Sequence, residues 1–392
     1  MVRSAAKNHR DVLIVTRPEQ QEAVLEAIRT DAITPELRQS LALDAYATTA
    51  HYDRAITRWL AGKKPLPTLD KGAGGDAGGL GLEKAGRLLH GDNPWQGADL
   101  FLTGSDREPC AVRARAVGKA RPTALRDLVD LDVALELAKQ LADPAAVLVR
   151  HGVPIAAAVG RSAAEAITRV TGSAHLVPGA ALALNRPFGS GCVEAFGAKK
   201  DLARAVIAPG VDENAAKALA GDDGPVILEV AGFDGRGRDA DHVDIRRIVG
   251  GLVIQQRDLA LLGDEEPVVA AGEISAKKRR DPYFAFACAK HAPSCAVALV
   301  KDGAMVGIGT GRPDVAGALD LALREAGEGA EGTALGFDAP LAAEDAPLLA
   351  RAAEAGVKTV ILPTGGESDE AVVKVAGDAG LVLMIAGLGH LR

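Results

Sequence analysis

The sequence predicts a protein of the α/β class, in which helices pack on a sheet. Three observations predict this class. Short apolar runs alternate with stretches of helical periodicity, apolar residues make up 48% of the chain while aromatic residues make up only 3%, and 392 residues suffice for two or three compact units. An interior so poor in aromatic rings must be built from Ala, Val, Leu and Ile, which suits alanine-rich helices on valine-rich strands.

The N-terminal region is predicted to hold one strand and two helices. Residues 11–16 form a short apolar run that favours a strand. Residues 19–29 and 35–60 repeat apolar side chains every 3.6 residues, which indicates two helices.

A linker is predicted after these helices. Residues 63–81 are rich in Gly, Pro and Lys, and such stretches connect compact units rather than form them. We therefore place a linker at residues 65–85.

Beyond the linker, strands and helices are predicted to alternate. The expected helix spans residues 162–170, and apolar runs indicate strands at residues 145–149, 180–184, 203–208, 357–362 and 381–386. The last two runs flank a helical stretch, so they are expected to pair in parallel.

The sequence also contains an internal echo. Residues 150–154 read R-H-G-V-P before an apolar run, and residues 290–294 read K-H-A-P-S before another. The repeat suggests two related α/β units, one domain length apart. An Asp-Gly pair at residues 302–303 further predicts a β-hairpin in the second unit.

The charge distribution argues against nucleic acid as a partner. Acidic residues outnumber basic ones by 52 to 45, which gives a formal charge of -7, and no basic cluster is accompanied by stacking aromatic residues. The run K-K-R-R at residues 277–280 is expected at a loop-to-helix junction, where a solvated surface is favoured over phosphate binding.

The cysteines and the apolar runs indicate a cytoplasmic protein. Cys110, Cys192, Cys288 and Cys295 form no C-x-x-C pair, so neither a metal site nor a disulfide framework is predicted. No leader pattern is found and no apolar run approaches the roughly 18 residues of a membrane span, so no membrane partner is expected.

Several segments match, in order, the motifs of one enzyme family. Residues 91–96 read G-D-N-P-W-Q, similar to G-x-N-P-H-Q, and residues 150–154 are similar to K-H-x-x-P. Further similarities lie at residues 246–258 (G-G-L-L-V-Q-x-R-D), 284–294 (F-A-W-x-x-x-K-H-x-x-S-N), 306–311 (V-G-I-G-A-G) and 387–392 (T-G-x-R-H-F). Together these segments resemble the family of the bifunctional AICAR formyltransferase/IMP cyclohydrolase, and the resemblance covers nearly the whole chain.

The resemblance implies a fold, a reaction and an assembly. It implies two deaminase-like α/β/α units, at residues 86–265 and 266–392, preceded by a remnant of the cyclohydrolase domain at residues 1–64. It implies that the formyl group of 10-formyltetrahydrofolate passes to the amine of AICAR, in a homodimer with active sites between subunits. Lys7 matches a lysine of the cyclohydrolase site, which this chain is not expected to complete alone.

Three residues are candidates for catalysis. His151 follows a predicted strand, and a neutral imidazole can take a proton from an amine near pH 7. Arg150 stands where the family has lysine, and it can stabilise an oxyanion but hardly shuttle a proton. Cys295 stands where the resemblance implies a catalytic asparagine, and it offers only a weak S–H donor. The alternatives are a histidine that hydrogen-bonds a loop and an arginine paired with a carboxylate.

Five residues are candidates for substrate binding. They are Gly91, Asn93, Lys290, Gly309 and Gly311, all within the motifs that resemble the family. The alternative for Asn93 is a turn-forming role, and Gly309 and Gly311 are equally consistent with a tight turn.

Other positions depart from the family pattern. Leu89 and Gly389 replace arginines that the resemblance implies bind the phosphate of the nucleotide, whereas Asp258 is retained and is also explained as a helix cap. Three hypotheses remain: an active formyltransferase, a catalytically eroded homologue that acts as a binding or regulatory dimer partner, and an enzyme for a substrate without the phosphate.

Overall fold

A computed structural model describes most of the chain: residues 1–61, 83–102, 108–118, 123–173, 176–220, 224–230, 243–263, 266–363 and 369–391. Nearly all of the predicted linker at residues 65–85 lies outside these ranges. The chain divides into two compact units. The first comprises Met1–Lys84, Phe101–Gly104 and Ala240–Arg257, and the second comprises Ala85–Leu100, Ser105–Asp239 and Asp258–Arg392.

The described elements alternate between helix and strand over most of the chain. The α-helices are α1 (Val2–Lys7), α2 (Gln20–Arg29), α3 (Pro35–Ala61), α4 (Leu125–Gln140), α5 (Ala163–Thr171), α6 (Ser190–Phe196), α7 (Glu213–Ala220), α8 (Arg280–Lys290), α9 (Val315–Ala326), α10 (Pro347–Glu354) and α11 (Asp369–Asp378). The strands are β1 (Glu83–Arg87), β2 (Asp99–Leu102), β3 (Arg115–Ala116), β4 (Ala145–Arg150), β5 (Val153–Val159), β6 (Ala180–Leu184), β7 (Ala203–Pro209), β8 (Val226–Val230), β9 (Val243–Ile248), β10 (Gly251–Gln256), β11 (Val268–Ala271), β12 (Val297–Lys301), β13 (Ala304–Gly309), β14 (Ala334–Phe337), β15 (Thr359–Leu362) and β16 (Val382–Ile385).

The first unit contains the predicted N-terminal helices but not the predicted strand. Helices α2 and α3 confirm the 3.6-residue pattern. Residues 11–16 are not part of any strand in the described structure. Ile14 instead packs on a small core of Ala6, Ala42 and Ala45, so its apolar character is explained by burial against helices. Strands β9 and β10 form an antiparallel hairpin.

The second unit is built on one twelve-stranded sheet, and the predicted α/β class is confirmed. Its strand order is β11-β16-β15-β14-β12-β13-β5-β4-β6-β7-β8-β3. The predicted strands at residues 145–149, 180–184, 203–208, 357–362 and 381–386 all lie in this sheet. As predicted, β15 and β16 pair in parallel.

The order of elements in this sheet repeats on either side of the contact between β13 and β5. Outward from that contact, each half has an antiparallel hairpin, then three strands that are parallel to one another, then an antiparallel edge strand. This repeat agrees with the two related units expected from the echo. The predicted boundaries at residues 86–265 and 266–392 remain predictions.

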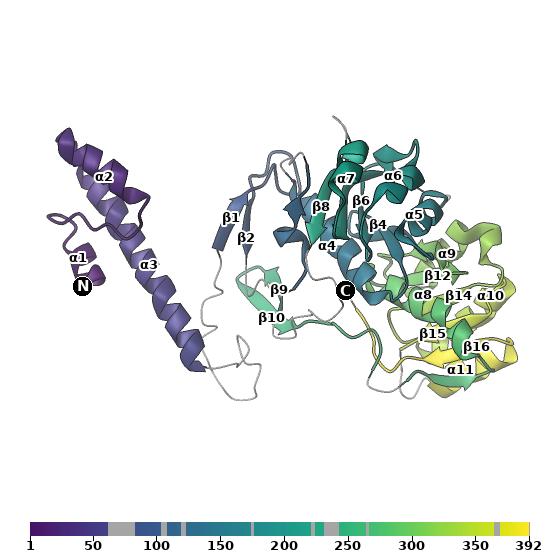
Figure 1. The fold of residues 1–392 in the computed structure, drawn as a ribbon. Coiled ribbons are helices and arrows are strands. Elements are labelled where there is room, and N and C mark those ends of the chain that lie inside the picture. The colour runs from purple at the N-terminus through teal and green to yellow at the C-terminus, as the bar shows by residue number, and fades with distance from the viewer. Residues whose placement is uncertain are drawn as a thin grey trace. The chain divides into compact units, whose positions relative to one another are not determined.

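Helices cover both faces of the sheet (Figure 1). Helices α4 and α8 share one apolar core that spans the two halves, whereas α5, α6 and α7 cover the other face of the first half and α9, α10 and α11 that of the second. Strand β4 shows why both faces are covered, because Val147 and Val149 face one core while Ala146 and Leu148 face the other. Such two-sided burial explains the uninterrupted apolar runs in the sequence.

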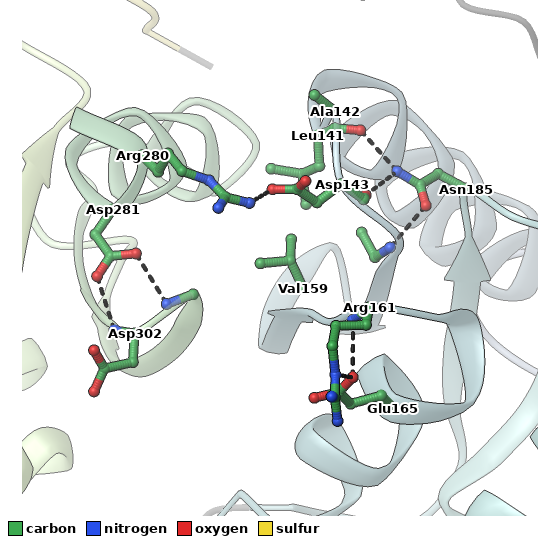
Figure 2. Close-up of polar contacts among 12 residues, drawn as sticks. Leu141, Ala142, Asp143, Val159, Arg161, Glu165, Asn185, Arg280, Asp281 and Asp302 are labelled. Carbon is green, nitrogen blue, oxygen red and sulfur yellow. Dashed lines mark hydrogen bonds and ion pairs between the residues drawn. The ribbon is translucent and has the colours of Figure 1, made fainter. Parts of the chain in front are cut away.

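Matching side-chain caps occur at equivalent strand ends in the two halves. Asn185 follows β6 and accepts a hydrogen bond from Ala145 N–H at 2.7 Å, and Asp338 follows β14 and accepts one from Ala296 N–H at 2.9 Å. Figure 2 shows the cap at Asn185.

A second pair of caps holds the two hairpin turns. Asp130 of α4 accepts from Gly152 N–H at 2.7 Å, and Asp281 of α8 accepts from Gly303 N–H at 2.9 Å, the latter visible in Figure 2. Residues 150–154 therefore correspond to the turn after β12. The echo with residues 290–294 does not match equivalent places, because those residues follow a helix instead of a strand.

Candidate active site

His151 lies in the turn of a hairpin. It follows β4 with φ +54°, Gly152 follows with φ +75°, and β5 then returns antiparallel to β4. Positive φ at both central residues is the geometry of a type I′ turn, and histidine enters the left-handed region more readily than most residues. His151 follows a strand as predicted, and the chain returns at once as a second strand, so the residue lies at the tip of a hairpin. The imidazole is exposed.

Two guanidinium groups flank this imidazole. Arg126 Nη1 lies 3.4 Å from His151 Nδ1, and Arg150 Nε lies 3.4 Å from His151 Nε2. Because arginine only donates and a neutral imidazole accepts at one nitrogen, only one of these contacts is a hydrogen bond at a time. The arrangement places two permanent positive charges beside a group that can accept a proton.

Arg126 was not predicted from the sequence. It lies in the first turn of α4, and its Nη2 is 3.7 Å from Asp92 Oδ1. A basic residue at this place opposes the positive end of the helix dipole, which favours acidic residues. That mismatch is the one signal by which the sequence could have indicated Arg126.

The segment with Gly91 and Asn93 forms a closed loop beside Arg126. Gly91 N–H donates to Gln96 O at 2.7 Å, and the Gln96 side chain accepts from Asn93 N–H at 2.9 Å and from its amide at 3.0 Å. A Cβ atom at Gly91 would lie 3.1 Å from Gln96 Cβ, so the tight turn favours glycine. Asn93 therefore forms a turn, which is one of the two roles considered for it from the sequence. Arg126 links this loop to the hairpin turn, because it contacts Asp92 on one side and His151 on the other.

Among the described residues, Arg150 contacts a backbone carbonyl and His151 rather than a carboxylate. Its guanidinium donates to the carbonyl of Pro178, in the segment that leads to β6. The partner keeps the arginine at the end of β4, next to His151.

Strand β13 connects this turn with the other predicted site residues. Its recorded pair with β5 joins Ala304, at the start of β13, to Ala158, near the end of β5. Since the strands are antiparallel, β13 runs towards the end of β5 that follows His151. Gly309 ends β13, so it lies at the end of the sheet that carries the His151 turn.

Cys295 and Gly311 lie together at this end of the sheet. Gly311 N–H donates to Pro293 O at 3.0 Å, and Cys295 N–H donates to Arg312 O at 3.2 Å. Gly311 has φ +63° with open space at its Cβ position, which is a turn that favours glycine. The structure thus brings the segments of two predicted motifs into one turn-to-turn contact.

The Cys295 thiol lies in an acidic environment. Burial raises the pKa of Cys295, and the carboxylates of Asp338, Asp314 and Asp345 raise it further. A thiol so placed stays protonated, which matches the weak S–H donor expected from the sequence. Burial also raises the pKa of Asp338, against the opposing hydrogen bonds from Ser294 and Ala296.

Lys290 is held below the surface by Asp258. Lys290 Nζ lies 2.9 Å from Asp258 Oδ1 and also donates to Ala260 O, and 3% of its side chain is exposed. Asp258 Oδ2 lies 2.6 Å from His390 Nδ1, and His390 Nε2 lies 2.9 Å from Leu261 O. Asp258 therefore bridges Lys290 and His390. Its interpretation as a helix cap is wrong, because the residues that follow it do not form a helix.

The electrostatics of this group favour an ionised carboxylate. Burial alone raises the pKa of Asp258, but hydrogen bonds from His390 and Lys290 lower it more, so the net pKa is below the usual value. His390 was not predicted as a functional residue. Its position near the end of the sequence gave no sign that it would share the Asp258 carboxylate with Lys290.

Two other predicted residues have placements that the sequence did not indicate. Gly309 packs against α9, because a Cβ atom there would lie 1.7 Å from Ala318 O. Lys7 is an exposed residue in the last turn of α1, in the first compact unit.

Among the described residues, no cluster of His, Cys, Asp and Glu side chains is arranged to hold a metal ion. No helix in the described ranges combines the length and apolarity of a membrane span.

Comparisons with known proteins place the chain among enzymes of purine biosynthesis. The family model described as the AICARFT/IMPCHase bienzyme matches residues 5–325. The bifunctional purine biosynthesis protein PurH of Dinoroseobacter shibae is 35% identical and is aligned over 100% of this chain and 75% of its own length. PurH of Synechococcus sp. (strain WH7803) is 33% identical with the same coverage, and PurH of Rhodopirellula baltica is 29% identical over 100% of this chain and 74% of its own.

Proposed function

Because the chain belongs to the AICARFT/IMPCHase bienzyme family of purine biosynthesis, we propose that it transfers a formyl group from 10-formyltetrahydrofolate to the amine of AICAR or of a closely related substrate. It acts in the cytoplasm as a homodimer. The observation that carries the proposal is the direction of β13, which brings the segments with Cys295, Gly309 and Gly311 to the end of the sheet where His151 lies.

The reaction has simple requirements that these residues can meet. The amine nitrogen attacks the formyl carbon, a new C–N bond forms, and the bond from that carbon to the folate nitrogen breaks. The amine loses a proton and the leaving folate nitrogen gains one. His151 takes the proton of the amine, while Arg150 and Arg126 stabilise the negative charge on the formyl oxygen.

The proposed roles of the other site residues follow from their placement. The loop at Gly91 and Asn93 supports Arg126 through Asp92, and the turn at Gly311 offers close backbone approach to a ligand. The Cys295 thiol donates a weak hydrogen bond. Lys7 belongs to a remnant of the second activity, and this chain is not proposed to carry out the cyclohydrolase step by itself.

The first experiment is a binding and turnover assay with purified protein. AICAR and a folate analogue are titrated separately, and formyl transfer is followed with 10-formyltetrahydrofolate. The His151→Ala variant should lose about 100-fold or more in kcat, as expected for loss of a general base. Turnover that is unchanged in this variant would contradict the role of His151.

A matched variant controls for nonspecific effects of removing a histidine. His51 is an exposed residue of α3 in the other compact unit, so His51→Ala should leave turnover unchanged. If both variants lose activity equally, the loss does not report on the proposed site.

The eroded homologue is the second candidate, and Cys295 favours it. The resemblance implies an asparagine there, and a thiol that stays protonated beside three carboxylates is a poor replacement for an amide. In this case, the protein binds a ligand or a partner but does not turn over. Ligand binding without formyl transfer in the wild-type protein would support this candidate.

A further inference from the structure

The C-terminal segment crosses the ends of three strands in the second half of the sheet. Ala386 N–H donates to Leu362 O at 2.9 Å, just after β16, and His390 N–H donates to Asp338 O at 2.8 Å. The Cβ position of Gly389 lies 3.6 Å from Pro363 Cβ. Residues 386–390 therefore run from β16 past the carboxyl end of β15 to that of β14.

The same segment reaches the surroundings of Cys295. At its end, His390 N–H donates to the Asp338 carbonyl. The carboxylate of Asp338 accepts from the N–H of Ala296, the residue that follows Cys295. Carboxyl ends of parallel strands are where open α/β sheets form ligand sites. The segment therefore borders the part of the proposed site that contains Cys295, so the contacts that hold the segment also hold this border.

His390 is fixed by acceptors on both ring nitrogens. Nδ1 faces a carboxylate oxygen of Asp258 at 2.6 Å, and Nε2 faces the Leu261 carbonyl at 2.9 Å. Each ring nitrogen thus lies at hydrogen-bond distance from an oxygen acceptor, and these two contacts hold the ring between Asp258 and Leu261. The ring is 1% exposed and lies 5.1 Å, centre to centre, from the Phe286 ring.

The equivalent place in the first half shows which part of this arrangement is common to both halves. Lys139 near the end of α4 corresponds to Lys290 at the end of α8, and its Nζ lies 3.3 Å from Glu108 and 2.5 Å from Glu136. A buried lysine paired with a carboxylate thus occurs twice. The recorded partners of Lys139 are these two glutamates, whereas the partner of Lys290, Asp258, also contacts His390.

We propose that Lys290, Asp258 and His390 form a clasp that holds residues 386–390 across the carboxyl ends of β14 and β15, and that Lys290 is a positioning residue rather than a substrate ligand. The burial and full engagement of Lys290 leave it to act through Asp258 and His390. The catalytic consequence rests on the proposed function, but the clasp itself does not.

The test compares Lys290→Met with Lys139→Met in the full chain. Both variants remove a buried, paired ammonium, but only the first loosens Asp258. Amide hydrogen exchange at residues 386–390 should accelerate at least ~10-fold in Lys290→Met, as expected for loss of one charge-assisted hydrogen bond, and stay unchanged in Lys139→Met. With active protein, Lys290→Met should raise KM more than it lowers kcat.

Two further variants keep the test decisive if Lys290→Met does not fold. Asp258→Asn and His390→Gln each retain part of the clasp and should accelerate exchange at the same residues. Unchanged exchange in a folded Lys290→Met variant, or equal acceleration in Lys139→Met, would overturn the proposal. If the protein shows no formyl transfer, the proposed function fails, while the exchange data still decide whether the clasp exists.

Discussion

Gly309 shows, at the scale of a residue, how packing can require a glycine that the sequence suggested for ligand contact. The spacing of Gly309 and Gly311 was open to either a tight turn or close approach to a ligand. The structure gives Gly311 a turn with positive φ, whereas Gly309 lies against the backbone of α9. Contact between a strand and the helix that follows it cannot be read from a short motif.

A substitution at Gly309 tests this interpretation. Gly309→Ala should lower the free energy of unfolding by about 3 kcal/mol, because the new methyl group overlaps the Ala318 carbonyl and α9 must move. Gly377 in α11 has open space at its Cβ position, so Gly377→Ala should raise that free energy by roughly 0.5 to 1 kcal/mol. Denaturant unfolding measures both, and similar effects at the two positions would contradict the packing argument.

At the scale of elements, the two hairpins show what local sequence can and cannot predict. The Asp302-Gly303 pair predicted the hairpin of β12 and β13, and the structure confirms it with positive φ at both residues. The His151-Gly152 pair forms the same turn between β4 and β5 but was not predicted. Histidine is a weaker turn signal than aspartate, and the cap from Asp130 supplies support that only tertiary structure provides.

The strand-end caps lead to a prediction about Asp338. Asn185, its counterpart, uses its amide to donate to Leu141 O and Asp143 O, both at 2.7 Å. Asp338 Oδ2 is buried and has no hydrogen-bond partner among the described residues. Asp338→Asn replaces that oxygen with an amide, so at pH 7 it should raise the free energy of unfolding by about 1 kcal/mol.

The pH dependence of this effect has a definite sign. Burial raises the pKa of Asp338 in the folded state, so the folded protein binds this proton more tightly than the unfolded one. The carboxyl group therefore contributes most stability when the pH is below its ordinary pKa of about 3.9. That contribution is lost as the pH rises through the raised pKa of the folded state. The advantage of Asp338→Asn should shrink towards pH 3, and an advantage independent of pH would contradict this cause.

At the scale of the whole molecule, the two halves of the twelve-stranded sheet are joined by polar contacts near the central strands and by a shared apolar core. Strands β5 and β13 share the recorded pair at Ala158 and Ala304, and Arg169 of α5 donates to Val159 O and to Asp302 O. Arg280 also pairs with Asp143 across the halves (Figure 2). Beneath these contacts, α4 and α8 share one apolar core, which links the halves energetically.

Cooperative unfolding of the two halves is therefore expected. Cys192 in the first half and Cys288 in the second are free and buried, so thiol labelling reports on each half separately. Both should become labelled at the same denaturant concentration in the wild-type protein. Arg169→Ala should lower both midpoints together, and two separate midpoints in the wild type would show that the shared core does not couple the halves.

The sequence by itself determined the fold class, the main helices and strands, and the family. These depend on periodicity, composition and ordered motifs, which are properties of the chain alone. Only the tertiary structure decided that Arg126 flanks His151 and that Asp258 joins Lys290 to His390. Such contacts join residues far apart in sequence, and side chains gain or lose a chemical role through the neighbours that folding gives them.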